Sequence, residues 1–249
     1  MARQKGIIKL KGKIGDISFY KTKDGYLARE KGGIEADRIK NDPAFARTRE
    51  NGAEFGVAAK AGKLLRDGLR PFLQVAGDKR ITSRLTKKMT EIKKYDATNE
   101  RGKRTVGTGI QTPLGIAALQ GFNFNNKSVL NSVLFATVNY DNANHEVSIT
   151  DLVPVNDFNN PSGATHVSIN MGVLELDFDN GEQEFTAGTA QILPIDGTQT
   201  TVTLAVTPPG AITTNKVAVL LIEFLQEVNG NLYSLKNGAY NVLNILQID

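Results

Sequence analysis

The sequence contains no cysteine and no tryptophan, and it has only two histidines. Without cysteine the chain forms no disulfide, no thiolate metal site and no thiol nucleophile. The histidines, His145 and His166, have no partner at metal-ligand spacing, so we predict no zinc site and infer no cofactor and no small-molecule substrate. No run of about 18 uncharged apolar residues occurs, which excludes a membrane-spanning helix.

The amino terminus also lacks the apolar region of a signal peptide, because Arg3, Lys5 and Lys9 interrupt it. We therefore expect synthesis in the cytoplasm without a cleavable signal. The sequence does not define the final location, and an extracellular particle or filament is one alternative.

Basic residues are scarce beyond residue 105. Residues 106–249 hold 3 Lys and Arg against 13 Asp and Glu, a formal charge of −10, whereas residues 1–105 hold 27 against 13, a charge of +14. Such asymmetry indicates a partner for each pole. The partners considered are another copy of the chain, a polyanion and a membrane surface. The remaining alternative is that one compact molecule holds both poles and neutralises them internally.

The residue pattern changes where the charge changes, and it predicts an α+β fold with two domains. Residues 17–22 and 26–29 flank Asp24-Gly25, a hairpin signal. A helix is expected to begin at Asp42-Pro43 and a second to cover residues 81–95. We predict a basic hairpin-plus-helix domain over residues 1–105. Residues 106–130 are expected to form a junction with a short helix from Thr112-Pro113.

Residues 131–249 are predicted to form an acidic domain made of strands. The expected strands are residues 133–140, 146–152, 165–178, 184–195, 200–207, 216–228 and 232–248. For the longer ones, a break or a bulge is the alternative to one continuous strand. About seven strands in roughly 120 residues favour an antiparallel immunoglobulin-like sandwich.

Two groups of side chains are the candidate contact sites. The assembly or polyanion-binding candidates are Arg47, Arg49, Lys79, Arg80, Arg84, Lys87, Lys88, Lys93, Lys94, Arg101, Lys103 and Arg104. Phosphate contacts need clustered cations, although exposed lysine-rich faces are also common on ordinary helices. The hairpin contact candidates are Ile17, Phe19, Tyr20 and Tyr26.

Two further patterns are weaker. Glu175, Asp177 and Asp179 alternate along one strand face, which we interpret as an acidic solvent face rather than a calcium loop. Gly107 and Gly109 fall in a stretch that fails the phosphate-loop pattern and is interpreted as a flexible junction.

Residues 6–20, GIIKLKGKIGDISFY, resemble the opening of small uncharacterised proteins common in Bacteroidota. Those proteins share a glycine-punctuated hairpin, an Arg-rich segment (here residues 41–51) and a Phe-Asn loop (here residues 121–126) before a β-rich end. The resemblance implies an architecture and no activity. Similar Arg-rich openings occur in phage-like structural proteins, which favours an assembly role.

Three hypotheses follow from these patterns. We predict a non-enzymatic, self-assembling structural subunit that forms a filament, tube or virion-like lattice through contacts between N-terminal and C-terminal domains of neighbouring copies. The alternative is a nucleic-acid-binding protein without base specificity. An enzyme is the third hypothesis. No nucleophile, metal or nucleotide motif supports it, but a dispersed carboxylate pair would leave no trace in sequence order.

Overall fold

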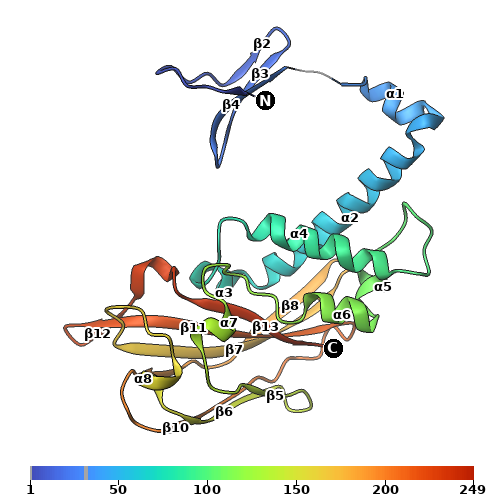
Figure 1. The fold of residues 1–249 in the computed structure, drawn as a ribbon. Coiled ribbons are helices and arrows are strands. Elements are labelled where there is room, and N and C mark those ends of the chain that lie inside the picture. The colour runs from blue at the N-terminus through green and yellow to red at the C-terminus, as the bar shows by residue number, and fades with distance from the viewer. Residues whose placement is uncertain (1, 31–32) are drawn as a thin grey trace. The chain divides into compact units, whose positions relative to one another are not determined.

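The computed structural model describes residues 2–30 and 33–249 and divides the chain into two compact units, residues 1–49 (unit 1) and 50–249 (unit 2). Helices and antiparallel sheets both contribute, so the α+β class is confirmed (Figure 1). The boundary between units falls in the first turn of helix α2 (Ala46–Gly68). The predicted boundary at residue 105 lies instead inside unit 2.

Unit 1 is built around a small antiparallel sheet with the strand order β1-β4-β3-β2. Its strands are β1 (Ala2–Arg3), β2 (Gly12–Ile14), β3 (Ile17–Thr22) and β4 (Gly25–Glu30). The predicted hairpin is therefore confirmed, and Gly25 turns it with a φ of +117°, a value that favours glycine. Helix α1 (Ala36–Asn41) and the 3-10 turn η1 (Pro43–Phe45) follow. The Asp42 carboxylate accepts a hydrogen bond from Ala44 N and caps η1.

Unit 2 consists of three layers. One face of the central sheet carries helices, and a second, three-stranded sheet lies against its other face (Figure 1). The helical elements are α2, α3 (Arg70–Val75), α4 (Ile81–Ile92), η2 (Lys93–Tyr95), α5 (Val106–Ile110), α6 (Pro113–Leu119), α7 (Leu130–Val133), α8 (Pro154–Asp157) and η3 (Leu235–Gly238). The helices expected over residues 81–95 and after Thr112-Pro113 are thus confirmed.

The strands of unit 2 form two antiparallel sheets. The central sheet has the order β12-β11-β7-β8, with β13 also paired to β11 and β9 also paired to β7, and the smaller sheet has the order β10-β6-β5. Their bounds are β5 (Asn139–Asp141), β6 (Glu146–Leu152), β7 (His166–Asp177), β8 (Glu182–Ala187), β9 (Gln191–Pro194), β10 (Thr200–Ala205), β11 (Lys216–Val228), β12 (Asn231–Ser234) and β13 (Val242–Ile248).

The central sheet is buried on both faces. Along β11, Val217 and Val219 pack into the core shared with the helices, whereas Leu220 and Ile222 pack into the core shared with the small sheet. A strand covered on both sides needs apolar residues at consecutive positions, which explains the unbroken run over residues 217–222. The helices beyond residue 50 therefore belong to the same folded body as the strands, and this is why the domain boundary does not follow the change in charge.

The junction around residues 106–119 is a tightly packed pair of short helices. An ideal Cβ at Gly109 would lie 2.3 Å from Ile92 O, and one at Gly115 would lie 2.1 Å from Gly109 O. Only glycine permits these approaches. The expectation of a flexible junction at Gly107 and Gly109 is therefore wrong, since both glycines are buried.

Three strand expectations also differ from the structure. The expected strand over residues 184–195 is divided into β8 and β9, because the ladder is interrupted at residues 188–190. The expectation of one strand over residues 133–140 is wrong, because α7 ends at Val133 and only β5, from Asn139, is extended and paired. The Leu134 backbone forms an isolated bridge to Phe158 instead of a ladder. Residues 232–248 are divided into β12, η3 and β13 because the chain turns between them.

Candidate functional site

Unit 1 carries a sheet face whose apolar residues are all exposed or half-buried. Residues opposite one another in an antiparallel pair point to the same face. The register places Ile17 beside Ile14 and Phe19 beside Ala28, and Tyr26 follows on that face. Two charged residues, Lys21 and Glu30, lie at the ends of the same face. Ile14 and Ile17 are 62% and 43% exposed. No described residue of unit 1 is buried, so this unit has no core of its own.

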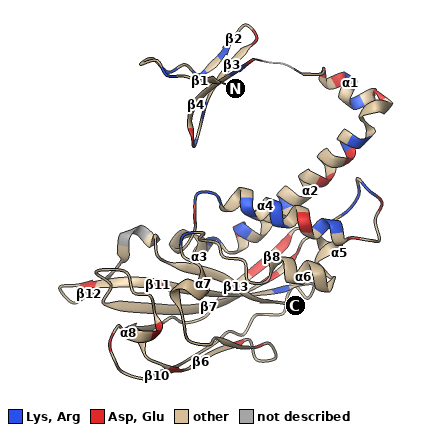
Figure 2. Cartoon of the chain, viewed as in Figure 1, with Lys and Arg blue, Asp and Glu red and all other residues tan. Residues whose placement is uncertain are grey.

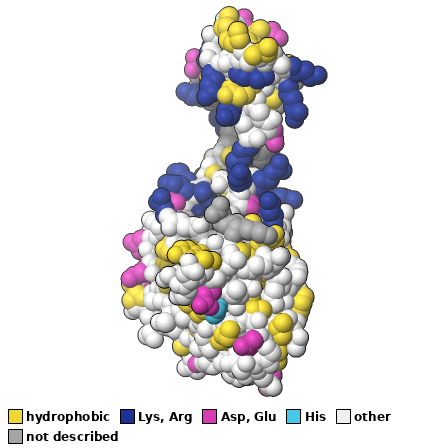
Figure 3. Space-filling view, turned by 90° about the vertical axis from the view of Figure 1, so that its left-hand side faces the viewer, with side chains coloured by type: hydrophobic (Ala, Val, Ile, Leu, Met, Phe, Trp, Pro, Cys, Tyr) yellow, Lys and Arg dark blue, Asp and Glu magenta, His cyan; other side chains and the backbone are white. Residues whose placement is uncertain are grey.

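The opposite face of the same sheet is basic. Lys13 lies beside Ser18, and Arg29 lies beside Ser18 on the other side. The Arg29 guanidinium also sits 5.7 Å from the Tyr20 ring centroid, in a cation–π contact. Of the four predicted hairpin contacts, Ile17, Phe19 and Tyr26 therefore share the apolar face, whereas Tyr20 lies on the basic face. Figure 3 shows hydrophobic side chains gathered on unit 1 with Lys and Arg side chains beside them.

The predicted cationic cluster lies along helix α4 and the loops at its two ends (Figure 2). Its exposed members are Lys79, Arg80, Lys87, Lys94, Arg101 and Lys103. Lys88 is half-buried and pairs with Glu91 at 3.4 Å, and Lys103 pairs with Glu100 at 3.5 Å. The amphipathic spacing of α4 causes this exposure, because Leu85, Met89 and Ile92 hold its other side against the core.

Lys93 is not part of that surface. Its ammonium is buried and donates to the Glu54 carboxylate, which also accepts from Gly102 N. Burial alone would raise the pKa of Glu54. The hydrogen bonds from Lys93 and Gly102 and the charges of Lys93 and Arg104 outweigh burial and lower that pKa. The expectation that Lys93 contacts an outside partner is therefore wrong, because the pair connects α2 to the end of α4.

Arg84 is also committed to internal contacts. Its guanidinium donates to Asp78 Oδ2 at 2.7 Å, to Asn123 O at 2.8 Å and to Phe124 O at 2.9 Å. It lies 5.1 Å from the Phe122 ring centroid. Arg84 thereby fixes the Phe-Asn loop of residues 121–126 to the start of α4, so most of its hydrogen-bonding capacity is used within the chain.

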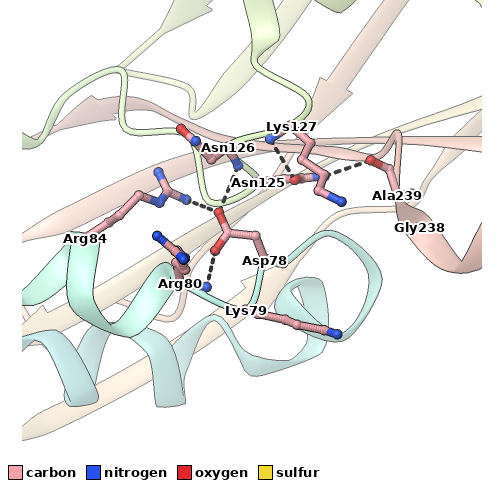
Figure 4. A pocket seen from close by; sticks show the side chains of 10 residues that line it. Asp78, Lys79, Arg80, Arg84, Asn125, Asn126, Lys127, Gly238 and Ala239 are labelled. Carbon is pink, nitrogen blue, oxygen red and sulfur yellow. Dashed lines mark hydrogen bonds and ion pairs between the residues drawn. The ribbon is translucent and has the colours of Figure 1, made fainter. Parts of the chain in front are cut away.

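Asp78 forms part of the wall of a cavity of about 380 Å³ between the α3–α4 loop, the Phe-Asn loop and η3 (Figure 4). Besides Arg84, it accepts hydrogen bonds from Asn126 N at 3.0 Å and Arg80 N at 2.5 Å. Burial would raise the pKa of Asp78, but these two backbone donors and the Arg84 charge lower it. Lys79, Arg80 and Lys127 also line this cavity.

The remaining predicted cations also have contacts within the chain or lie at the start of α2. Arg49 donates to Ile39 O at 2.8 Å and to Asp42 O at 2.9 Å, which closes the end of α1. Arg101 pairs with Glu50 at 3.3 Å. Arg104 is half-buried near Glu54. Arg47 is exposed in the first turn of α2.

An acidic face lies on the β7–β8 hairpin (Figure 2). Glu175 stands opposite Glu184, and Asp177 stands opposite Glu182, so these four carboxyl groups share one sheet face. Glu182 and Glu184 are exposed, but Glu175 is fully buried, accepts from Ala211 N at 3.1 Å, and has no hydrogen-bond partner on Oε1 among the described residues. The expected solvent-exposed acidic face is therefore wrong at Glu175. The sequence pattern showed the alternation but not the loop that covers this residue.

The two histidines lie in different surroundings. His145 contacts Tyr140 Oη at 3.0 Å and Lys216 Nζ at 3.3 Å, whereas His166 contacts Thr165 Oγ1 at 2.9 Å. Within residues 2–30 and 33–249, no group of three or more acidic or histidine side chains could hold a metal ion. Among the described helices, none has the length and apolar character that a bilayer span requires.

Comparison with protein families, with characterised protein sequences and with solved structures gives no match for this chain.

Proposed function

We propose that the chain is a structural subunit that assembles with copies of itself, and that unit 1 is the contact element. The observation that carries this proposal is one sheet face in a unit where no described residue is buried. Its apolar residues are exposed (Ile14 and Ile17) or half-buried (Phe19, Tyr26 and Ala28). A small sheet needs an apolar face packed on something to be stable. Exposed apolar faces rimmed by charge are typical of protein interaction sites.

The charge distribution supports a copy of the same chain as the partner. Residues 1–49 hold 13 Lys and Arg against 6 Asp and Glu, while the region beyond residue 105 has a formal charge of −10. Contacts between opposite poles of successive copies are heterologous, and they close into rings or extend as filaments. The proposal includes an immunoglobulin-like arrangement of the strands, which the two antiparallel sheets over one shared core support.

Light scattering and negative-stain microscopy of the purified chain test this proposal. We expect particles much larger than one chain at low salt, and we expect the Ile17→Asp/Phe19→Asp double variant to remain monomeric because it places charge on the apolar face. Leu114→Asp is the matched control, since Leu114 is 62% exposed on α6 and outside that face. A strictly monomeric wild-type chain at high concentration and low salt would refute the proposal.

Binding of nucleic acid is the alternative function, and the exposed cations around α4 favour it. Lys87 and Lys94 are exposed on the α4–η2 segment, and Lys79 and Lys127 line the neighbouring cavity. Phosphate contacts of this kind weaken steeply with salt. Binding of unrelated DNA sequences at about 50 mM salt that is lost on neutralising Lys87 and Lys94 would support this alternative, and no binding at that salt would exclude it.

A further inference from the structure

We propose that the edge strand β2 of one copy pairs with the edge strand β8 of a second copy, so that the sheet of unit 1 continues the central sheet of its neighbour. This inference rests on the proposed function and names the two surfaces that meet. Among the described strands, β2 pairs only with β3, and β8 pairs only with β7. Each therefore presents an edge whose backbone can form a further ladder.

The two edges carry opposite charge. Lys11 precedes β2 and Lys13 lies within it, while Glu182 and Glu184 are exposed on β8. Opposite charges on neighbouring strands are stabilising, and like charges directly opposite one another are destabilising. Pairing of β2 with β2 would place lysines together, and pairing of β8 with β8 would place glutamates together. The charges thus disfavour both symmetric pairings and favour the mixed one.

The faces of the two sheets match in the same register. On β8, Glu182 and Glu184 share the face of Glu175 and Asp177, whereas Phe185 lies opposite Leu174 on the face that packs against the helices. On β2, Lys13 belongs to the basic face and Ile14 to the apolar face. Side chains alternate along every strand. In one of the two possible orientations of β2 against β8, Lys13 therefore lies on the face of Glu182 and Glu184, and Ile14 lies on the face of Phe185. The flipped pairing would place Ile14 among carboxylates, and a one-residue slip would have the same effect.

The acidic face of the β7–β8 hairpin would be stabilised by a basic partner strand. Glu175 opposite Glu184 and Asp177 opposite Glu182 are carboxyl pairs in direct cross-strand positions. Among the residues that the structure describes, no ion pair neutralises Glu182 or Glu184. Glu175 already has Lys216 opposite it on β11, so lysines supplied by a neighbouring strand would pair with Glu182 and Glu184. Because the two surfaces differ, one contact leaves β8 of the first copy and β2 of the second copy available for further contacts.

The absence of cysteine from the chain makes a direct test simple. One preparation carries Lys13→Cys and another carries Glu184→Cys, with Glu182→Cys as the second position because it is the neighbouring residue on the same face. Directly opposite strand residues have Cα atoms about 4.5–5.5 Å apart, within the range that a disulfide spans. We expect mild oxidation of the mixed preparations to give a cross-linked species of two chains, in higher yield than either preparation alone.

Lys63→Cys mixed with Glu184→Cys is the control, because Lys63 is exposed on α2 and outside unit 1. A charge exchange provides the second arm. Lys11→Glu/Lys13→Glu and Glu182→Lys/Glu184→Lys should each give monomers in light scattering. Their mixture should recover assemblies in which the two variants alternate, because each variant's β2 then meets a β8 of opposite charge.

The outcomes separate this inference from the proposed function. If the wild-type chain assembles but neither cysteine pair cross-links above the control, β2–β8 pairing is wrong and assembly itself stands. If the Lys13→Cys/Glu184→Cys double variant instead closes a disulfide within one monomeric chain, the pairing occurs inside one copy and the intermolecular contact is refuted. A wild-type chain that never assembles refutes both.

Discussion

The buried Glu54–Lys93 pair gives a sharp test of how the helical layer is held together. The two side chains are 5% and 8% exposed and connect α2 with η2. Removing one partner leaves the other charge buried without compensation, which costs about 3–5 kcal/mol. We therefore expect Lys93→Met and Glu54→Gln each to lower the free energy of unfolding by roughly that amount.

The double variant Glu54→Gln/Lys93→Met should be less damaging than either single variant. It leaves no buried charge at either of the two positions, and the amide oxygen of the introduced glutamine can still accept from Gly102 N, as the Glu54 carboxylate does at 2.9 Å. Its expected cost is about 1–2 kcal/mol, the range of one altered neutral hydrogen bond. The double variant should therefore lose much less stability than the sum of the losses in the two single variants, which gives a negative interaction energy in a double-mutant cycle.

Urea unfolding followed by far-UV circular dichroism measures all three variants against wild type. Thermal melts provide a second readout, since each kcal/mol corresponds to about 2–4 °C for a unit of this size. Single variants that cost less than about 1 kcal/mol, or a double variant that costs the sum of the two, would refute the assignment of a buried, charged pair.

Three further predictions concern unit 2. The folded-state pKa values of Glu54 and Asp96 are lowered, because their hydrogen bonds outweigh the opposing effect of burial. Their contribution to stability is therefore present above the unfolded-state pKa, near 4, and is lost as the pH falls through the lowered folded-state pKa. Urea unfolding between about pH 6 and 3 should show this decline, and Glu54→Gln should make it shallower. Asp96→Asn should cost about 1–3 kcal/mol, because the carboxylate accepts hydrogen bonds from Thr98 N, Asn99 N and Thr105 N, and a value near zero in the same assay would contradict this role. Gly109→Ala should lower the free energy of unfolding by about 1–3 kcal/mol or more, because the added Cβ forces α5 away from Ile92 O. Gly52→Ala is the control: its Cβ meets no atom within 4 Å, so it should be neutral or stabilising by up to about 1 kcal/mol. Equal shifts in melting temperature for the two variants would refute the close approach at Gly109.

Local signals predicted the elements that depend on local chemistry. Asp24-Gly25 identified the β3–β4 hairpin, and Thr112-Pro113 identified the start of α6, where Thr112 Oγ1 accepts from Gly115 N. The apolar spacing from Ile81 to Ile92 identified α4. In each case a turn, a cap or one helical face is sufficient to define the element, so the sequence alone could supply it.

The domain boundary depended on packing and could not be predicted from charge. The charged residues mark the solvent side of α2 and α4, while Ala58, Leu65 and Leu85 on their other sides belong to the core that the helices share with the central sheet. The useful signal was the apolar run over residues 217–222, which indicates a strand covered twice. The sequence pattern does not show which segments cover the two faces of this strand. The helices before residue 120 cover one of them.

The candidate site was predicted as a set of cations without their partners. Counting charges could not distinguish Lys87, which faces solvent, from Lys93, whose acidic partner lies 39 residues earlier in the sequence. The apolar face of unit 1 was anticipated through Ile17, Phe19 and Tyr26, but the separation of Tyr20 required the strand register.

The order of synthesis gives the doubly covered central sheet a kinetic consequence. Gly121 N donates to Ile245 O and Phe124 N to Leu243 O, so the segment of residues 121–124 is completed by β13, which is synthesised much later. Contacts between such distant segments slow folding because a large loop must close first. A chain without β13 lacks residues of both cores, because Leu243 and Ile245 pack into the core shared with the helices and Val242 into the core shared with the small sheet. Deletion of Val242–Ile248 should therefore unfold unit 2 as a whole.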